Sequence, residues 1–419
     1  MPNSHLISVS GRGFRIFLAG RTVSELGSRV TREGLPIIAV LLLHATAQDL
    51  SLIAGFSYIV ALVAAPLAGV LADRSRRRPL LVAADIFRAA VLALLTLFAL
   101  LGLLQFWQLL LAFCLVAALN TLFDVADQAW LPGLVGRSQL ESANAALSVA
   151  SAIGETGGPA LMGVLIQFLG GPLTILSDAV SYLASAVTLL QLHNPEPPPV
   201  RMRQHVTLAV RDGLAALWRH PLLRPLAVAA ALLSLSGGIF DALYAFFALR
   251  DLHLSPFAIG MLITGGGLGA LLGGAIAPNL ARRFGLGPVT LYGLLGFGLL
   301  TLLVPLAPVT PLTAFICLLA AQFFGDLAST LFSFGEAVLR QSVTPGAWLG
   351  RISGSQRLLG NVLGAVGAFG GGLMAGSFAV RGALGVAALC SLLGLLWLLR
   401  SPLPRLAAAP SGEPDSFPA

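Results

Sequence analysis

The sequence predicts an all-α membrane protein in which 12 transmembrane helices form two pseudo-symmetric bundles of six. Three observations predict this class. Of the 419 residues, 57% are hydrophobic and 10% are charged, and the mean hydropathy is +0.88, whereas soluble proteins carry about 25% charged residues. Apolar runs recur that are long enough to cross a bilayer core of ~30 Å as helices. The pattern of the first half then recurs in the second half.

The first bundle is expected within residues 1–192 and the second within residues 224–400, because short polar or Gly- and Pro-containing turns separate six apolar runs in each range. We expect the helices at 14–43, 50–72, 80–102, 106–129, 143–169, 172–192, 225–249, 257–281, 288–306, 311–334, 353–377 and 382–399.

A linker at 193–223 and a tail at 401–419 lie outside the bundles. The proline-rich run 194–199 ends the apolar pattern. An amphipathic helix around 208–218 is then expected to lie along the membrane surface. The tail is rich in Pro, Ala and Ser, so we expect it to be disordered and cytoplasmic.

Arginine indicates the orientation of the helices. Four arginines occupy five positions at 74–78, cannot lie in hydrocarbon, and mark this turn as cytoplasmic. All 25 basic residues are arginine; we assign 18 to cytoplasmic segments, 2 to outer loops and 5 to helix interiors. The net charge of +7 is therefore a topology signal and not a nucleic-acid footprint. An even number of spans places both termini in the cytoplasm.

The two halves share their connectors. Residues 274–283 stand between the eighth and ninth runs where 69–78 stand between the second and third, with Pro278 in place of Asp73. The connectors 131–137 and 343–351 also match. This parallel repeat predicts two related six-helix bundles.

The sequence argues against several classes of function. Three scattered cysteines and six scattered histidines give no disulfide framework and no metal-ligand spacing. There is no phosphate-binding Gly-Lys-Ser/Thr loop, so ATP is not expected to drive the protein. No enzyme signature, cofactor site, nucleic-acid site or removable signal peptide is expected.

The turn after the second run carries a family resemblance. Gly69-Val70-Leu71-Ala72-Asp73-Arg74, followed by a basic run through Arg77, resembles the helix 2–3 loop signature of the major facilitator superfamily of transporters. Arg76 stands where that signature has a second glycine, as in the branch of macrolide-efflux and enterobactin-export proteins, and the connector 140–145 resembles the same branch. The resemblance implies a monomeric transporter of the bacterial inner membrane that works by alternating access. A generic cytoplasmic loop remains the alternative reading of the motif.

The fifth run contains a second motif. Gly154, Gly158, Pro159 and Gly163 resemble the glycine-rich signature of facilitator antiporters. Small residues allow close helix packing, and the proline removes one helical hydrogen bond. A packing face without antiporter meaning is the alternative, and Glu155 is a further candidate cavity acid.

Scarce charges inside apolar runs are the candidates for substrate binding and proton coupling, because charges in a bilayer usually face a cavity or a partner. Arg21, Glu25, Arg29 and Glu33 follow at steps of four along one helix face. In the resembled fold this helix lines the cavity; a structural ion ladder is the equal alternative. Asp241 and Asp326 are lone acids that can bind and release a proton in a low-dielectric site, or else bond a neighbouring helix.

A cytoplasmic gate is expected from a second charged set. It combines the loop motif with charges of the third and fourth runs: Gly69, Asp73, Arg74, Arg77, Arg88, Asp124 and Asp127. Gly69 is expected to allow close helix approach, and Asp73 to meet basic groups. Substrate binding is the alternative role for Arg88, Asp124 and Asp127. Asp85 is an intrahelical candidate partner of Arg88, and Asp178 has no assigned role.

The function expected is proton-coupled export of amphipathic small molecules such as drugs or siderophore-like compounds. The expected partners are that substrate and membrane lipids, and the proton gradient takes the place of a cofactor. A lipid or lysophospholipid flippase, or an importer of the same fold, is the alternative within transport. A non-transporting membrane scaffold or sensor is the alternative of another class.

Overall fold

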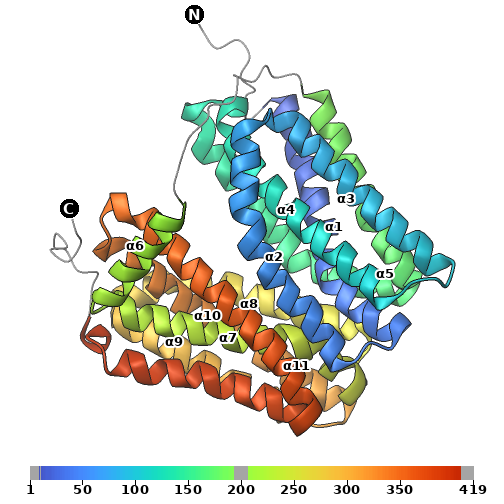
Figure 1. The fold of residues 1–419 in the computed structure, drawn as a ribbon. Helices are drawn as coiled ribbons and strands as arrows, with labels where there is room; N and C mark the ends of the chain where they lie inside the picture. Colours follow the sequence, from blue (N-terminus) through green and yellow to red (C-terminus); the bar gives the residue numbers. More distant parts are fainter. Residues whose placement is uncertain (1–8, 10, 193–205, 407–419) are drawn as a thin grey trace, which may run out of the picture. The chain divides into compact units, whose positions relative to one another are not determined.

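The computed structural model describes residues 9, 11–192 and 206–406, and every regular element among them is helical (Figure 1). The α-helices are α1 (Arg12–Leu43), α2 (Ala47–Arg74), α3 (Arg77–Leu100), α4 (Phe106–Val135), α5 (Leu140–Gln191), α6 (Val206–Arg219), α7 (Leu223–Phe246), α8 (Pro256–Phe284), α9 (Leu286–Thr301), α10 (Pro311–Val343) and α11 (Gly346–Leu399). Three short elements are η1 (Arg137–Gln139), the π-helical η2 (Phe247–Asp251) and η3 (Leu403–Arg405).

The all-α prediction is confirmed for the described residues. Eight of their helices are long and apolar enough to cross a membrane, and α9 is apolar but shorter. The count of 12 spans stays a prediction. Two of the eight, α5 and α11, each cover two of the expected spans.

Both long helices are broken where two expected spans meet. Gly170 has φ 77° and ψ 170° inside α5, a conformation that glycine adopts without steric penalty. Ala379 has φ 61° and ψ 157° inside α11, which is strained for a residue with a Cβ atom. The chain therefore changes direction at both positions.

The chain forms two compact units. Unit 1 contains residues 1–45, 59–203 and 255–264, and unit 2 contains residues 46–58, 204–254 and 265–419. The first part of α2 therefore groups with the second half of the chain, and the first part of α8 with the first half. The sequence-based division at 192 and 224 does not predict that these parts of α2 and α8 group with the opposite half of the chain.

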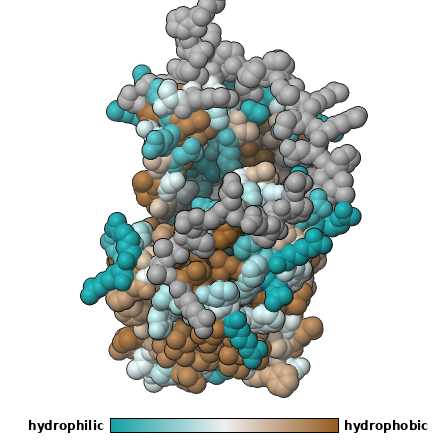
Figure 2. Space-filling model, turned by 90° about the vertical axis from the view of Figure 1, so that its left-hand side faces the viewer, coloured by the Kyte–Doolittle hydropathy of each residue, from teal (hydrophilic) through white to brown (hydrophobic). Residues whose placement is uncertain are grey.

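Each unit has its own apolar core. In unit 1, Phe14 and Phe17 of α1 pack with Trp130 of α4, with the Phe17 and Trp130 rings 5.5 Å apart edge to face. In unit 2, the core joins Leu226 of α7 to Phe332 of α10. Hydrophobic side chains, drawn in brown, cover broad parts of the face shown in Figure 2. Such exposed apolar surface suits contact with lipid chains.

The linker helix packs differently from the prediction. Ala216 and Leu217 of α6 are buried in the core of unit 2. At Gly213, an added Cβ atom would clash with the carbonyl group of Arg351 in α11, so the two backbones approach closely. Part of the apolar face of α6 is therefore covered by protein, and its expected position along the membrane surface stays a prediction. Residues 193–205 lie outside the described residues.

The start of the expected disordered tail is also ordered. Leu403 in η3 is fully buried, and the backbone N–H of Gly287 donates to the carbonyl of Leu406 at 3.0 Å. Residues 401–406 thus pack against α9, and residues 407–419 lie outside the described residues.

Candidate substrate and coupling site

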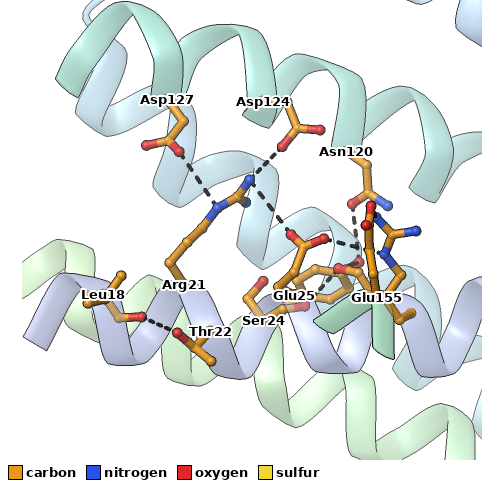
Figure 3. Close-up of polar contacts among 12 residues, drawn as sticks. Leu18, Arg21, Thr22, Ser24, Glu25, Asn120, Asp124, Asp127 and Glu155 are labelled. Carbon is orange, nitrogen blue, oxygen red and sulfur yellow. Dashed lines mark hydrogen bonds and ion pairs between the residues drawn. The ribbon is translucent and has the colours of Figure 1, made fainter. Parts of the chain in front are cut away.

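Three charges follow one another along α1. The Glu25 carboxylate lies 3.8 Å from the Arg21 guanidinium (Figure 3). It lies 3.4 Å from the Arg29 guanidinium. The spacing of four residues per step places these side chains on the same helix face. The Glu33 carboxylate lies 3.7 Å from the guanidinium of its neighbour Arg32 and is not part of the Arg21–Glu25–Arg29 contacts.

Helix α4 supplies two carboxylates to Arg21. Arg21 donates a hydrogen bond of 2.7 Å to Oδ1 of Asp124, and its Nε lies 3.6 Å from Oδ2 of Asp127. Asp124 and Asp127 are one helical turn apart, so they approach the same guanidinium (Figure 3). Both acids therefore contact an arginine of α1 that was not part of the expected gate set.

Helix α5 contributes a further carboxylate, which contacts Arg29. Arg29 donates a 2.8 Å hydrogen bond to Oε1 of Glu155. Gly154 faces Glu25, where an added Cβ would lie 2.6 Å from Cγ, and Gly158 faces the first side-chain atoms of Arg29. The two glycines of the expected antiporter motif thus form the surface on which the charged face of α1 lies.

The other end of that motif contacts α8. An added Cβ at Gly163 would lie 2.9 Å from the carbonyl oxygen of Pro256. Gly260 in turn packs on the carbonyl of Pro159, and Thr264 donates to the carbonyl of Thr156 at 2.9 Å. The motif therefore packs on both α1 and the first part of α8, which supports the packing interpretation of its glycines.

The cluster is defined as Arg21, Glu25, Arg29, Asp124, Asp127 and Glu155, and it is partly exposed. The side chains of Asp124 and Glu155 are 55% and 59% exposed, whereas those of Arg21 and Glu25 are 15% and 16% exposed. Because α4 and α5 are apolar enough to cross a membrane, exposed carboxylates on them need water or a polar ligand. The cluster is therefore suited to the wall of an aqueous path.

A second polar network lies buried beside the cluster. Arg88 of α3 pairs with Asp85 and donates to Oδ1 of Asn120 at 2.6 Å. Tyr182 also donates to Asn120, at 3.1 Å, and bonds Ser28 of α1 at 2.9 Å. The Asp85 and Arg88 side chains are 0% and 2% exposed, so the network is buried, and the expected intrahelical pairing of Arg88 with Asp85 is confirmed. Oδ2 of Asp85 and Nε of Arg88 have no hydrogen-bond partner among the described residues.

Phe123 connects the cluster to the buried network. The guanidinium carbons of Arg21 and Arg88 lie 4.9 Å and 4.4 Å from the centroid of its ring. Phe123 itself is 1% exposed. Sequence reasoning missed Phe123, Asn120 and Tyr182; the polar Asn120 within an apolar run was the one available signal.

The helix 2–3 loop does not join these charges. An added Cβ at Gly69 would meet no described atom within 4 Å, so the expected close approach at this glycine is wrong. Asp73 and Arg74 are exposed, and no described residue pairs with the Asp73 carboxylate. Arg77 instead donates to the carbonyl of Ala129, at 2.7 Å, at the end of α4.

The two lone acids of unit 2 have different surroundings. Tyr58 donates a 2.7 Å hydrogen bond to Asp241, a partner that sequence reasoning missed. Asp326 is half-buried next to Gly266, and no described residue forms an ion pair with it. Of the expected coupling acids, Asp326 alone lacks both a cationic partner and a hydrogen-bond donor among the described residues.

Asp178 is a further buried acid, on α5. It is 0% exposed, and its Oδ1 accepts a 2.8 Å hydrogen bond from Ser181. Gly27 of α1 packs directly on this pair. Among the described residues no group of three His, Cys, Asp or Glu side chains could hold a metal ion.

Comparisons with known proteins support this architecture. The family described as transmembrane secretion effector matches residues 4–419. A protein of Bacillus subtilis described as an uncharacterized MFS-type transporter, YfiS, is 27% identical over 87% of this chain and 87% of its own length. The multidrug efflux pump Tap of Mycolicibacterium fortuitum is 25% identical over 84% of this chain and 86% of its own length.

Solved structures show the same fold. A bacterial homologue of the iron transporter ferroportin in an inward-facing state matches with a TM-score of 0.72 and 19% identity, over 92% of this chain and 98% of that one. The nucleoside transporter NupG matches with a TM-score of 0.72 and 14% identity, over 93% of this chain and 98% of that one.

Proposed function

Because the chain belongs to the transmembrane secretion effector family of the major facilitator superfamily, we propose that it exports amphipathic small molecules in exchange for protons. It is a multi-pass membrane transporter, and its relatives include a multidrug efflux pump. The proposal adds the direction, the coupling ion and the class of substrate. Alternating access of two bundles around a site within the membrane is the mechanism.

One observation carries the proposal: a charged cluster with exposed carboxylates stands on apolar helices. Charges placed within such helices destabilise insertion by ~2.5–3.5 kcal/mol each, unless they face water, a partner or a substrate. The Arg21–Asp124 and Arg29–Glu155 hydrogen bonds tie α1 to α4 and α5. A helix with exchangeable ion pairs can bind cargo and release it as the bundles move.

Asp326 is the acid that we assign to proton coupling. Glu25 lies between two arginines, and Asp241 accepts a hydrogen bond from Tyr58. Asp326 lacks such partners among the described residues, so binding and release of a proton changes its charge without breaking an ion pair. Its side chain is half-buried.

A lipid flippase is the weaker alternative. Arginines of α1 would have to hold a phosphate group, but Arg21 and Arg29 already lie within 4 Å of carboxylates. A phosphate would displace these acids or lie next to them, which is electrostatically unfavourable. An importer differs from our proposal only in direction.

The setting of the proposed transport is the bacterial cytoplasmic membrane. Both termini are expected in the cytoplasm, and the protein is proposed to act as a monomer. The proton gradient supplies the energy, without ATP, a metal or an organic cofactor. No enzymatic step is part of the proposal.

Flux into proteoliposomes tests the function. Vesicles with an acidic interior and an imposed pH gradient are given three dyes: cationic rhodamine 6G, a neutral coumarin and anionic carboxyfluorescein. Proton-driven accumulation of any dye supports export; scrambling of labelled lipid without dye movement supports a flippase. If neither moves, transport is refuted for these substrates and a scaffold or sensor is favoured.

Two variants test the coupling residue. Asp326→Asn is expected to abolish the response of dye flux to the pH gradient while dye exchange at equal pH persists. Asp212→Asn, the same change on α6 outside the apolar helices, is the matched control and should keep the response. If Asp326→Asn keeps it as well, Asp326 is not the coupling acid.

A further inference from the structure

We propose that the charged cluster of unit 1 binds the positive group of an amphipathic organic cation, through the exposed carboxylates of Asp124 and Glu155. The inference rests on the proposed export function and names the substrate class of the same site. Either a protonated amine or a quaternary onium group would supply the charge.

The charge balance of the cluster is the first argument. It contains four carboxylates and two guanidinium groups, so two negative charges are uncompensated when all are ionised. Both arginines are fully engaged: Arg21 contacts three of the acids and Arg29 contacts two. An apolar helix bundle screens such charge poorly, so the excess attracts a cation.

The position of the free oxygens is the second argument. Arg21 bonds Oδ1 of Asp124 and Arg29 bonds Oε1 of Glu155. Among the described residues no hydrogen bond reaches Oδ2 of Asp124 or Oε2 of Glu155, although both side chains are more than half exposed. Each carboxylate therefore presents one oxygen outward on α4 or α5, where a ligand can approach it.

Asp127 adds a buried carboxylate to the same cluster. This residue is 5% exposed, and its carboxylate points toward Arg21 (Figure 3). Its Oδ2 lies 3.6 Å from Arg21, and its buried Oδ1 has no hydrogen-bond partner among the described residues. A buried carboxylate with one unsatisfied oxygen is unfavourable. A cation on the exposed side would stabilise it, whereas an anion would destabilise it further.

The class of cation follows from the helices that carry the site. Both α4 and α5 are apolar enough to cross a membrane. The apolar side chains of these helices give an organic cation a surface on which to bury its own apolar groups, which a small hydrated inorganic ion cannot use. Siderophore-like anions are disfavoured for the same electrostatic reason, because they would meet the outward carboxylates first.

Two ions of matched shape and opposite charge provide the test. Tetraphenylphosphonium and tetraphenylborate are titrated into the purified full-length protein in detergent, and binding is measured by equilibrium dialysis. We expect the phosphonium to bind and the borate to bind much more weakly. Asp124→Asn and Glu155→Gln should each weaken phosphonium binding about fivefold, as expected for a half-exposed charge contact.

Glu141→Gln is the matched control, because Glu141 is an exposed acid in the first turn of the same helix α5. It should leave phosphonium affinity unchanged. Equal or tighter binding of the borate, or unchanged affinity in both cluster variants, would overturn the inference.

The dye-flux and phosphonium-binding experiments distinguish failure of the export proposal from failure of the cation-binding proposal. If the neutral or anionic dye moves down the proton gradient while the phosphonium does not bind, the export function stands and the cation inference is wrong. If the phosphonium binds with the expected variant pattern but no dye moves, the cation site stands and the export proposal is wrong.

Discussion

Replacing Gly154 by alanine tests the packing on which the cluster depends. The added Cβ would lie 2.6 Å from Cγ of Glu25, 3.3 Å from its Cβ and 3.4 Å from its backbone carbonyl carbon. Ordinary contact begins near 3.4 Å, so Cγ must move by about 0.8 Å, the difference between 3.4 Å and 2.6 Å. A change of rotamer cannot move Cβ, which lies 0.1 Å inside ordinary contact (3.4 Å less 3.3 Å), so α1 must also shift slightly away from α5.

The magnitude follows from comparison with a second glycine. Overpacking destabilises a well-packed interior by about 1–3 kcal/mol, while alanine favours a helix interior over glycine by about 1 kcal/mol. Gly69→Ala in α2 gains the same helix propensity but meets no described atom within 4 Å. The difference between the two variants therefore isolates the steric effect, and Gly154→Ala should be less stable than Gly69→Ala by about 1–3 kcal/mol.

Thermal unfolding in detergent measures this difference. We expect the Tm of Gly154→Ala to lie at least ~2 °C below that of Gly69→Ala. Displacement of Glu25 also disturbs its contacts with Arg21 and Arg29, so phosphonium affinity should fall in Gly154→Ala and persist in Gly69→Ala. Equal Tm values with unchanged affinity would refute the close packing of α1 on α5.

Three further changes have expected outcomes. Arg88→Leu leaves buried Asp85 without its cation and should destabilise the protein by about 3–5 kcal/mol, whereas Asp85→Leu combined with Arg88→Leu should recover much of the lost Tm. Burial lowers the pKa of His220 from 6.5, and its Nδ1 accepts hydrogen bonds from the N–H groups of Leu222 and Leu223. Folding therefore favours the neutral imidazole. The stability that neutral His220 contributes is complete above pH ~6.5 and is lost as pH falls toward the lowered pKa. His220→Asn keeps a hydrogen-bond acceptor that does not titrate, so the Tm of this variant should depend less on pH. Arg381 donates to the carbonyls of Pro305 and Ala307 at 3.0 Å and 2.9 Å, so Arg381→Met should lower stability by about 1–3 kcal/mol by denaturant titration, and an unchanged midpoint would contradict this role.

Helix positions are the part of the fold that the sequence predicts well. The expected boundaries at 169 and 172 enclose the break at Gly170, and those at 377 and 382 enclose the break at Ala379. Length, apolar content and turn residues are local properties, so a local reading suffices. The packing partner of α6 is different, because an amphipathic pattern is the same whether lipid or α11 covers the apolar face.

The charged residues show where a local reading ends. The spacing of Arg21, Glu25 and Arg29 predicts their shared face, since all three lie on one helix. The contact of Arg21 with Asp124 depends on the rotation of α4 about its own axis, which no spacing within α1 contains. The pair of Arg88 with Asp85 lies within one helix, so a local reading could indicate it.

Two glycines also show that a contact between helices cannot be read from one helix alone. Gly69 belongs to a recognisable loop motif but has open space where a Cβ would be, while Gly154 packs on Glu25. A glycine in a sequence indicates that close approach is possible, and only the neighbouring helix decides whether it occurs. The motif around Gly154 and Gly158 thus gains a physical meaning: without side chains there, Glu25 and Arg29 can lie against α5.

The two polar networks of unit 1 differ in burial and in charge balance. Arg88 is buried, balanced by Asp85 and bonded to Asn120, so disrupting it would leave a buried charge and is strongly unfavourable. The cluster around Arg21 and Arg29 has excess acid and two exposed carboxylates, so breaking one of its half-exposed ion pairs has a small energetic cost. Phe123 contacts both arginines and keeps the exchangeable cluster next to the rigid network. The ligand exchange proposed for this protein therefore involves the cluster and not the Arg88 network.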